Sequence, residues 1–142
     1  MGKFSRDKGK RGEREVVNIL RDELGSDLEI GRNHAQCDKG GSDIAGNLPY
    51  SIEVKNHDKT SVGLWWQQAC KQATPGKAPV LIYKVPYKGW RVVLELDLFS
   101  VFPTDNNDTV EMDIYTFCNL TREFIANAVM VDDNRPALHL DS

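Results

Sequence analysis

Two acidic side chains and one lysine stand at spacings that could support metal-dependent chemistry. Asp43 precedes Glu53 by ten residues, and Lys55 follows Glu53 by two. The segment 46–49, Gly-Asn-Leu-Pro, favours a chain reversal, so we expect a β-hairpin that brings Asp43 beside Glu53. Two adjacent carboxylates repel each other unless a cation lies between them, and their hard oxygen ligands suit Mg²⁺ or Mn²⁺. Such a pair suits hydrolysis of a phosphodiester.

The run that carries Glu53 has the alternation of a β-strand with one face in the core. Side chains along a strand point to opposite faces in turn, so Glu53 and Lys55 share one face with Ser51, and Ile52 and Val54 point into the core. Lys55 can therefore place a positive charge beside the carboxylates without being a metal ligand.

A third carboxylate, Glu13, belongs to a predicted helix that runs from about Lys10 to Leu24 and is closed by Gly25. Glu13 lies one turn before Val17 on the apolar stripe of this helix, where an acid is costly unless a charged group meets it. The alternative is an exposed acid in the first turn, which the helix dipole favours. From the local sequence alone, the exposed position is the better interpretation.

The segments around these residues predict an α/β fold. The chain passes from the Glu53 strand through a helix to the next strand, which is a βαβ unit with two parallel strands. The other predicted elements are a strand at Leu28–Arg32, a helix at Ser61–Ala73, strands at Pro79–Val85 and Trp90–Leu96, a short helix at Asp97–Phe102, a strand at Val110–Phe117 and a helix at Thr121–Val129.

The net charge of −3 conceals an asymmetry along the chain. Residues 1–94 carry sixteen Lys and Arg against eleven Asp and Glu, whereas residues 95–142 carry two against ten. The basic part contains the candidate site, and local charge decides where a polyanion can lie. Residues 1–9 precede any apolar period, so we predict a flexible basic arm that becomes ordered on phosphate. The alternative is that both charged parts are solvated faces.

Length and composition indicate one domain of 142 residues in a reduced compartment. No apolar run approaches the ~20 residues that a membrane span needs, and the N-terminus lacks the apolar segment of a signal peptide. Three cysteines are an odd number without a CxxC pair, which favours free thiols over a disulfide framework. We therefore expect a cytoplasmic protein without a membrane partner.

Four segments together resemble the PD-(D/E)xK nuclease superfamily. They are KGKRGEREVV at 8–17, GSDI at 41–44, IEVK at 52–55 and WWQQA at 65–69. The opening is similar to archaeal-type Holliday-junction resolvases and related phage-encoded nucleases. The resemblance covers roughly residues 8–95, and it leaves 103–142 as an acidic C-terminal extension. It implies a restriction-endonuclease-like αβββαβ core, with a central mixed sheet flanked by helices.

The resemblance also implies roles for particular residues. Asp43 matches the central metal-binding aspartate, Glu53 the second acid and Lys55 the lysine of the signature. The implied metal ligands are Asp43, Glu53 and the carbonyl of Val54, with Glu13 ligating directly, through water or at a second metal. The implied metal is Mg²⁺, for which Mn²⁺ is expected to substitute.

At two positions the match to the superfamily motif is ambiguous or differs from the usual residue. Gln68 corresponds to a glutamine found after the signature in several branches, although the adjacent Gln67 leaves the choice between them open. Ser42 stands where proline commonly precedes the aspartate. Sequence-independent contacts to DNA are expected from the basic residues Lys8, Lys10, Arg11, Arg14, Arg32 and Lys39.

The activity implied by the resemblance is that of a metal-dependent DNA endonuclease, specifically a structure-specific Holliday-junction resolvase. Such an enzyme acts on branched DNA as a homodimer, and a phage-encoded one works in the host cytoplasm. One alternative is a nickase or end-processing nuclease of the same fold. Another, from a different class, is a DNA-binding module that does not cleave.

Overall fold

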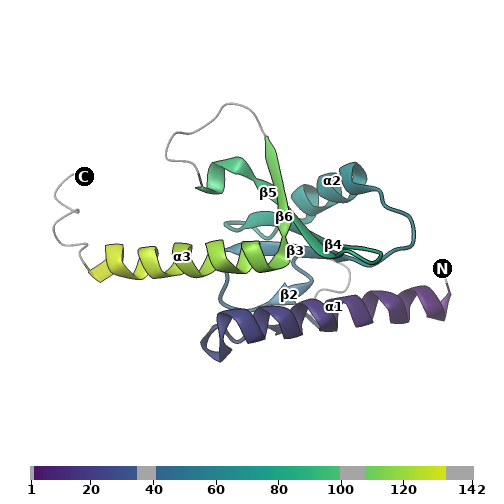
Figure 1. Ribbon diagram of the computed structural model, residues 1–142, viewed down its shortest axis with the longest axis horizontal. Coiled ribbons are helices and arrows are strands. Elements are labelled where there is room, and N and C mark those ends of the chain that lie inside the picture. Colours follow the sequence, from purple (N-terminus) through teal and green to yellow (C-terminus); the bar gives the residue numbers. More distant parts are fainter. Residues whose placement is uncertain (1, 35–40, 100–107, 134–142) are drawn as a thin grey trace.

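The structure is a computed structural model that describes residues 2–34, 41–99 and 108–133 (Figure 1). Three helices accompany six strands in the described part of the chain. The helices are α1 (Lys3–Leu24), α2 (Val62–Gln72) and α3 (Ile114–Asp133), with 3₁₀ turns at Ser26–Leu28 and Leu96–Phe99. The strands are β1 (Gly31–Arg32), β2 (Ile44–Ala45), β3 (Tyr50–Lys55), β4 (Ala78–Val85), β5 (Gly89–Glu95) and β6 (Thr109–Asp113).

The central sheet is mixed and has the strand order β3-β4-β5-β6. Strand β3 is parallel to β4 because the chain crosses over through α2, while β4, β5 and β6 are antiparallel neighbours. This arrangement confirms the predicted α/β fold, with a mixed sheet flanked by helices. It also makes β3 an edge strand, and β3 carries Glu53 and Lys55.

Helices cover both faces of this sheet. Helices α1 and α3 lie side by side on one face (Figure 1), where their apolar side chains form the main core with alternate residues of the strands. Helix α2 covers the other face, on which Ala69 packs against Leu81, Tyr83 and Val93. Along β3, Ile52 and Val54 belong to the main core, so Glu53 and Lys55 lie on the α2 face.

Helix α1 begins at Lys3, so the prediction of a flexible arm over residues 1–9 is wrong for the described part of that segment. The prediction relied on the missing apolar period and on the glycines at positions 9 and 12. Lys and Arg are good helix formers, and a tertiary contact supports this part of the helix. The side chain of Asn56, just beyond β3, donates a hydrogen bond of 3.0 Å to the Lys8 carbonyl. The basic residues of this segment are therefore displayed at helical spacing.

The described C-terminal part is integral to the core, which corrects the prediction of an acidic extension. Helix α3 begins at Ile114, so the strand predicted to reach Phe117 ends at Asp113. The core-facing residues of α3 are Ile114, Phe117, Cys118 and Thr121, all nearly or fully inaccessible to solvent. Arg122 donates to the Glu23 carbonyl at 2.7 Å, which ties α3 to α1. Phe117 and its neighbours turn inward because a helix, unlike a strand, places apolar residues three and four positions apart on one face.

Three smaller predictions also differ from the structure. Only Gly31–Arg32 of the predicted strand 28–32 is extended, because Leu28 lies in a 3₁₀ turn. The predicted short helix at 97–102 is a 3₁₀ turn over Leu96–Phe99, and residues 100–102 lie outside the described part. The described cysteines, Cys70 and Cys118, are free thiols as expected. None of the described helices combines the length and apolar character needed to cross a membrane.

Gly12 is the point of closest approach between α1 and the end of β3. A Cβ added there would lie 2.8 Å from Cβ of Asn56 and 3.1 Å from Cη2 of Trp90, so the helix would have to move. Gly9 lies in the same helix, and a Cβ added there meets nothing within 4 Å.

We predict opposite effects for alanine at these two positions. Gly12→Ala should lower the free energy of unfolding by about 1–2 kcal/mol, because overpacking outweighs the gain in helix propensity. Gly9→Ala, the matched control, should raise it by up to about 1 kcal/mol. Urea denaturation of both variants measures the difference. Equal stabilisation by the two alanines would show that α1 does not need the close approach at Gly12.

Candidate active site

Ser42 and Asp43 are fastened to β3 by hydrogen bonds from both backbone and side chain. The Asp43 N–H donates to the Ile52 carbonyl at 2.7 Å, and the Ile52 N–H donates to Ser42 Oγ at 2.8 Å. Ser42 Oγ also donates to the Ile44 carbonyl at 2.7 Å. Ser42, which replaces a proline in the matching motif, is thus a structural residue that sequence reasoning missed. Its hydroxyl, unlike a proline ring, can join the two segments.

The prediction that Asp43 lies beside the Glu53 strand is correct, but the predicted hairpin pairing between the two segments is not. The chain does reverse between Ala45 and Tyr50, but β2 pairs with β1 in the register Arg32↔Ile44 and forms no regular ladder with β3. Asp43 nevertheless lies beside β3, because its carboxylate Oδ2 accepts the Val54 N–H at 2.8 Å. β3 is an edge strand, so its outer backbone groups are available for this contact.

Glu53 and Lys55 lie together on the α2 face of β3, as the alternation predicted. The Glu53 side chain is buried, and Lys55 Nζ lies 3.5 Å from Glu53 Oε1. Burial raises the pKa of Glu53, the positive charge of Lys55 opposes that rise, and the negative charge of Glu13 adds to it. Lys55 therefore compensates part of the negative charge at this edge of the sheet.

Asp43 is the most strongly perturbed carboxylate of the site. It is only 7% exposed, and its pKa is raised to about 7, mainly by burial. The negative charge of Glu53 contributes to this rise, while the Val54 N–H opposes it. Burial and the neighbouring acid thus both disfavour the ionised form of Asp43. A divalent cation, which prefers hard oxygen ligands, fits this pair of carboxylates, and the Val54 carbonyl is the third oxygen donor that the resemblance implies.

Glu13 is neither a simple exposed acid nor a member of an assembled cluster. Its carboxylate is partly buried and accepts a hydrogen bond of 3.0 Å from Arg32 Nε. Its negative charge raises the pKa of both Asp43 and Glu53, so it lies near the pair. Within residues 2–34, 41–99 and 108–133, no group of three or more His, Cys, Asp or Glu side chains is arranged to hold a metal. The structure therefore brings together Asp43, Glu53 and Lys55, and it keeps Glu13 paired with Arg32.

The two glutamines of α2 have different surroundings. Gln67 is exposed and lines a cavity with Glu95 of β5, a strand that β4 separates from β3. Gln68 is half-buried. This difference favours Gln68 over Gln67 as the residue that could serve the site.

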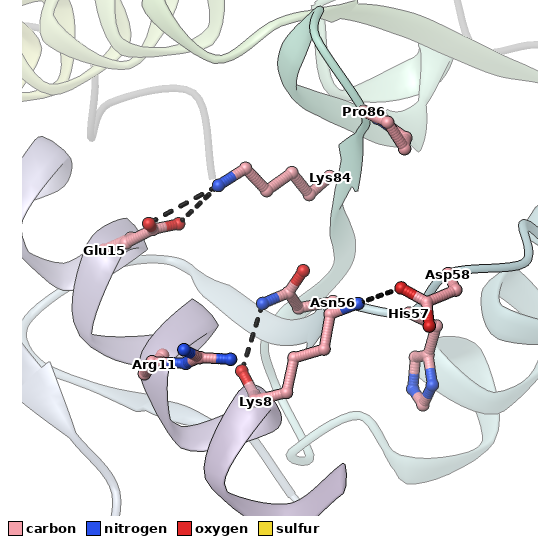
Figure 2. A pocket seen from close by; sticks show the side chains of 8 residues that line it. All are labelled: Lys8, Arg11, Glu15, Asn56, His57, Asp58, Lys84 and Pro86. Carbon is pink, nitrogen blue, oxygen red and sulfur yellow. Dashed lines mark hydrogen bonds and ion pairs between the residues drawn. The ribbon is translucent and has the colours of Figure 1, made fainter. Parts of the chain in front are cut away.

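The basic residues expected to contact DNA lie on two different sides of α1. Lys8 and Arg11 line a cavity of about 390 Å³ just beyond β3, in which Lys8 pairs with Asp58 and Lys84 Nζ lies 3.1 Å from Glu15 (Figure 2). The second cavity, of about 320 Å³, is lined by Arg14, Val17, Asn18, Arg21, Arg32 and His34. Lys10 is exposed, and Lys39 lies outside the described residues. Helix α1 therefore separates two cationic hollows, and its inward side carries Glu13.

The raised pKa of Asp43 predicts a pH dependence for the metal-free protein. A carboxyl whose pKa is higher in the folded than in the unfolded state contributes stability that is complete below about pH 4 and is lost as the pH rises through about 7. Between pH 5 and 8, Tm in EDTA should therefore fall more steeply for wild type than for Asp43→Asn. The control is Asp22→Asn at an exposed position of α1, which should retain the wild-type slope. Parallel profiles for wild type and Asp43→Asn would contradict the assignment.

Comparison with known proteins was consistent with this geometry. Residues 4–132 match the family described as "Phage putative PDDEXK endonuclease". The match extends the resemblance of residues 8–95 through β6 and almost to the end of α3, the part first interpreted as an extension. The search of curated proteins returned no match. Because the family match covers most of the chain, this protein belongs to the phage PD-(D/E)xK endonuclease family.

Proposed function

We propose that this chain hydrolyses DNA phosphodiesters at the edge of β3 with the help of a divalent cation. The observation that carries the proposal is the buried pair Asp43 and Glu53, in which the pKa of Asp43 is raised to about 7 and Lys55 stands beside Glu53. Buried like charges are costly, so such a pair persists where a bound cation relieves the repulsion.

The proposed ligands are Asp43, Glu53 and the carbonyl of Val54, with Mg²⁺ as the ion and Mn²⁺ as a substitute. Bound there, the ion would supply a water of lowered pKa and would neutralise charge that develops on the phosphate. Lys55, already oriented by Glu53, would orient that water or, through its positive charge, help its deprotonation, and would contact a phosphate oxygen. Gln68, on the helix that covers this face, would help to position the phosphate.

The ion pair between Glu13 and Arg32 gives both residues a role in this proposal. Glu13 would join the metal site directly, through water or at a second position, once Arg32 releases it. The freed guanidinium would then bind a phosphate, with which it can form two parallel hydrogen bonds. This exchange would leave no charge unpaired. The metal ion would take the place of Arg32 beside Glu13, and the phosphate would take the place of Glu13 beside Arg32.

For the substrate, we propose branched DNA of the Holliday-junction type. The support is the resemblance of residues 8–17 to resolvases, together with the two cationic hollows on either side of α1. Resolution of a four-way junction needs two incisions on opposed strands, so the proposal includes a two-fold dimer with one site per chain. Nicking or end processing is the corresponding activity of a single site.

The proposal is tested with labelled four-way junctions, flaps and plain duplex in Mg²⁺, Mn²⁺ and EDTA. We expect metal-dependent cleavage, fastest on the junction. Asp43→Asn should lose roughly 100-fold or more of the rate while DNA binding persists or tightens, because a charge that repels phosphate is removed. Cleavage of wild-type rate by Asp43→Asn would exclude this site. DNA binding by wild type without cleavage of any substrate would instead support a binding module.

Glu13 and Glu15 provide a second test within one helix. Glu13→Gln should abolish or strongly reduce metal-dependent cleavage, whereas Glu15→Gln should remain active. Glu15 is exposed and pairs with Lys84 of β4 rather than with Arg32. Cleavage assays of both variants should be accompanied by Tm in EDTA, where removal of Glu13 should reduce repulsion in the acidic pair but also leave Arg32 without its partner. Loss of activity in Glu15→Gln alone would mean that the wrong side of α1 has been assigned.

A further inference from the structure

The tip of the β4–β5 hairpin contains a residue in an unfavourable backbone conformation. The Lys88 N–H donates to the Val85 carbonyl at 2.9 Å, which closes a four-residue turn with Pro86 and Tyr87 at its centre. Tyr87 has φ 65°. Pro followed by a residue with positive φ is the pattern of a type II turn, in which Gly or Asn is the favoured second residue. A tyrosine at this position is strained.

Within the described part of the chain, the Tyr87 side chain makes no packing contact that would offset this strain. The Tyr87 side chain is fully exposed, at 108% of its reference area, so its ring is not packed against this chain. Strained backbone conformations cluster at active sites and at ligand-binding segments. The ring of Tyr87 is therefore available to a partner outside the chain.

The surroundings of Tyr87 indicate which kind of partner this is. Pro86, its direct neighbour, lines the 390 Å³ cavity together with Lys84, Arg11 and His57 (Figure 2). Asn56 and His57, which follow Lys55 directly in the chain, line the same cavity.

The charges of the cavity favour an anionic partner. Two of its cations are already paired, Lys8 with Asp58 and Lys84 with Glu15. Arg11 lines the same cavity, and among the described residues it has no carboxylate partner. Lys88 adds an exposed charge next to Tyr87. An exposed aromatic ring with cations in its neighbourhood is suited to stack on a nucleobase while the cations bind phosphates.

We propose that Tyr87 stacks on a DNA base that is not covered by a neighbouring base, while Arg11 and Lys88 hold the adjacent phosphates. The inference rests on the proposed function and deepens it, because it makes Tyr87 a specificity-determining residue. In continuous duplex both faces of a base are stacked, so the ring finds a free face only at a branch, a flap or an open end. The preferred substrate is therefore DNA with an unstacked base near the scissile strand.

The test measures binding in EDTA, so that it does not depend on cleavage. Tyr87→Gly should bind flap and four-way-junction DNA about tenfold more weakly than wild type, and plain duplex equally well. Its Tm should not fall, because glycine relieves the positive φ. Tyr87→Phe, which keeps the ring, should retain wild-type affinity. Lys88→Gln, the charge control, should weaken binding to branched and duplex DNA alike. A 2-aminopurine placed at the branch point should lose its protein-dependent quenching in Tyr87→Gly.

The outcomes separate this inference from the proposed function. Equal affinity of Tyr87→Gly and wild type for every DNA would overturn the inference and would leave the ring to a protein partner. An equal loss on branched and duplex DNA would also overturn it, because the ring would then make no distinction between them. Absence of metal-dependent cleavage by wild type would refute the proposed function, while the binding comparison could still be read.

Discussion

The attachment of Asp43 to the edge strand β3 is the constraint on which the site depends. The Asp43 N–H bonds to the Ile52 carbonyl, and its carboxylate accepts the Val54 N–H, so backbone groups define both the position and the direction of this side chain. Successive residues of a strand face opposite sides, so a slip of one residue would carry Glu53 and Lys55 into the main core. The Ser42 hydroxyl resists such a slip because it bonds to Ile52 as well as to Ile44.

The edge position of β3 explains how acids from three segments come near one another. Glu53 lies on the face covered by α2, whereas α1 packs against the opposite face. In the middle of a sheet these groups would be separated by the strands themselves. At the edge, β2 follows directly after Asp43 and pairs with β1, and Arg32 of β1 forms an ion pair with Glu13. Gly12 packs closely on Asn56, and this contact sets the distance between α1 and the end of β3. The position of Glu13, the next residue of α1, depends on that distance.

The extension of α1 to Lys3 changes how the basic N-terminal residues act. A flexible arm would follow phosphates by becoming ordered, at an entropic cost. A helix presents its cations at fixed spacing, and here they divide between two hollows on either side of α1. One hollow lies beside the β4–β5 hairpin with Tyr87, and the other contains the arginines around Arg32. Cationic side chains thus lie on both sides of α1, the helix that carries Glu13.

What the sequence alone determined is the class of fold and which residues make up the candidate site. The spacing of Asp43, Glu53 and Lys55 together with period-two alternation was enough to predict a strand that carries an acid and a lysine on one face, and the βαβ crossover predicted the parallel pair β3 and β4. These features are local, because each depends on residues close together in the chain. Only the tertiary structure decided that the segment before Lys10 is helical, that Phe117 belongs to a core helix, that β2 pairs with β1, and that Arg32 engages Glu13. Each of these depends on a contact between segments far apart in the sequence, such as the hydrogen bonds of Asn56 with Lys8 and of Tyr50 with Thr121. The local pattern of residues along the chain does not specify such contacts.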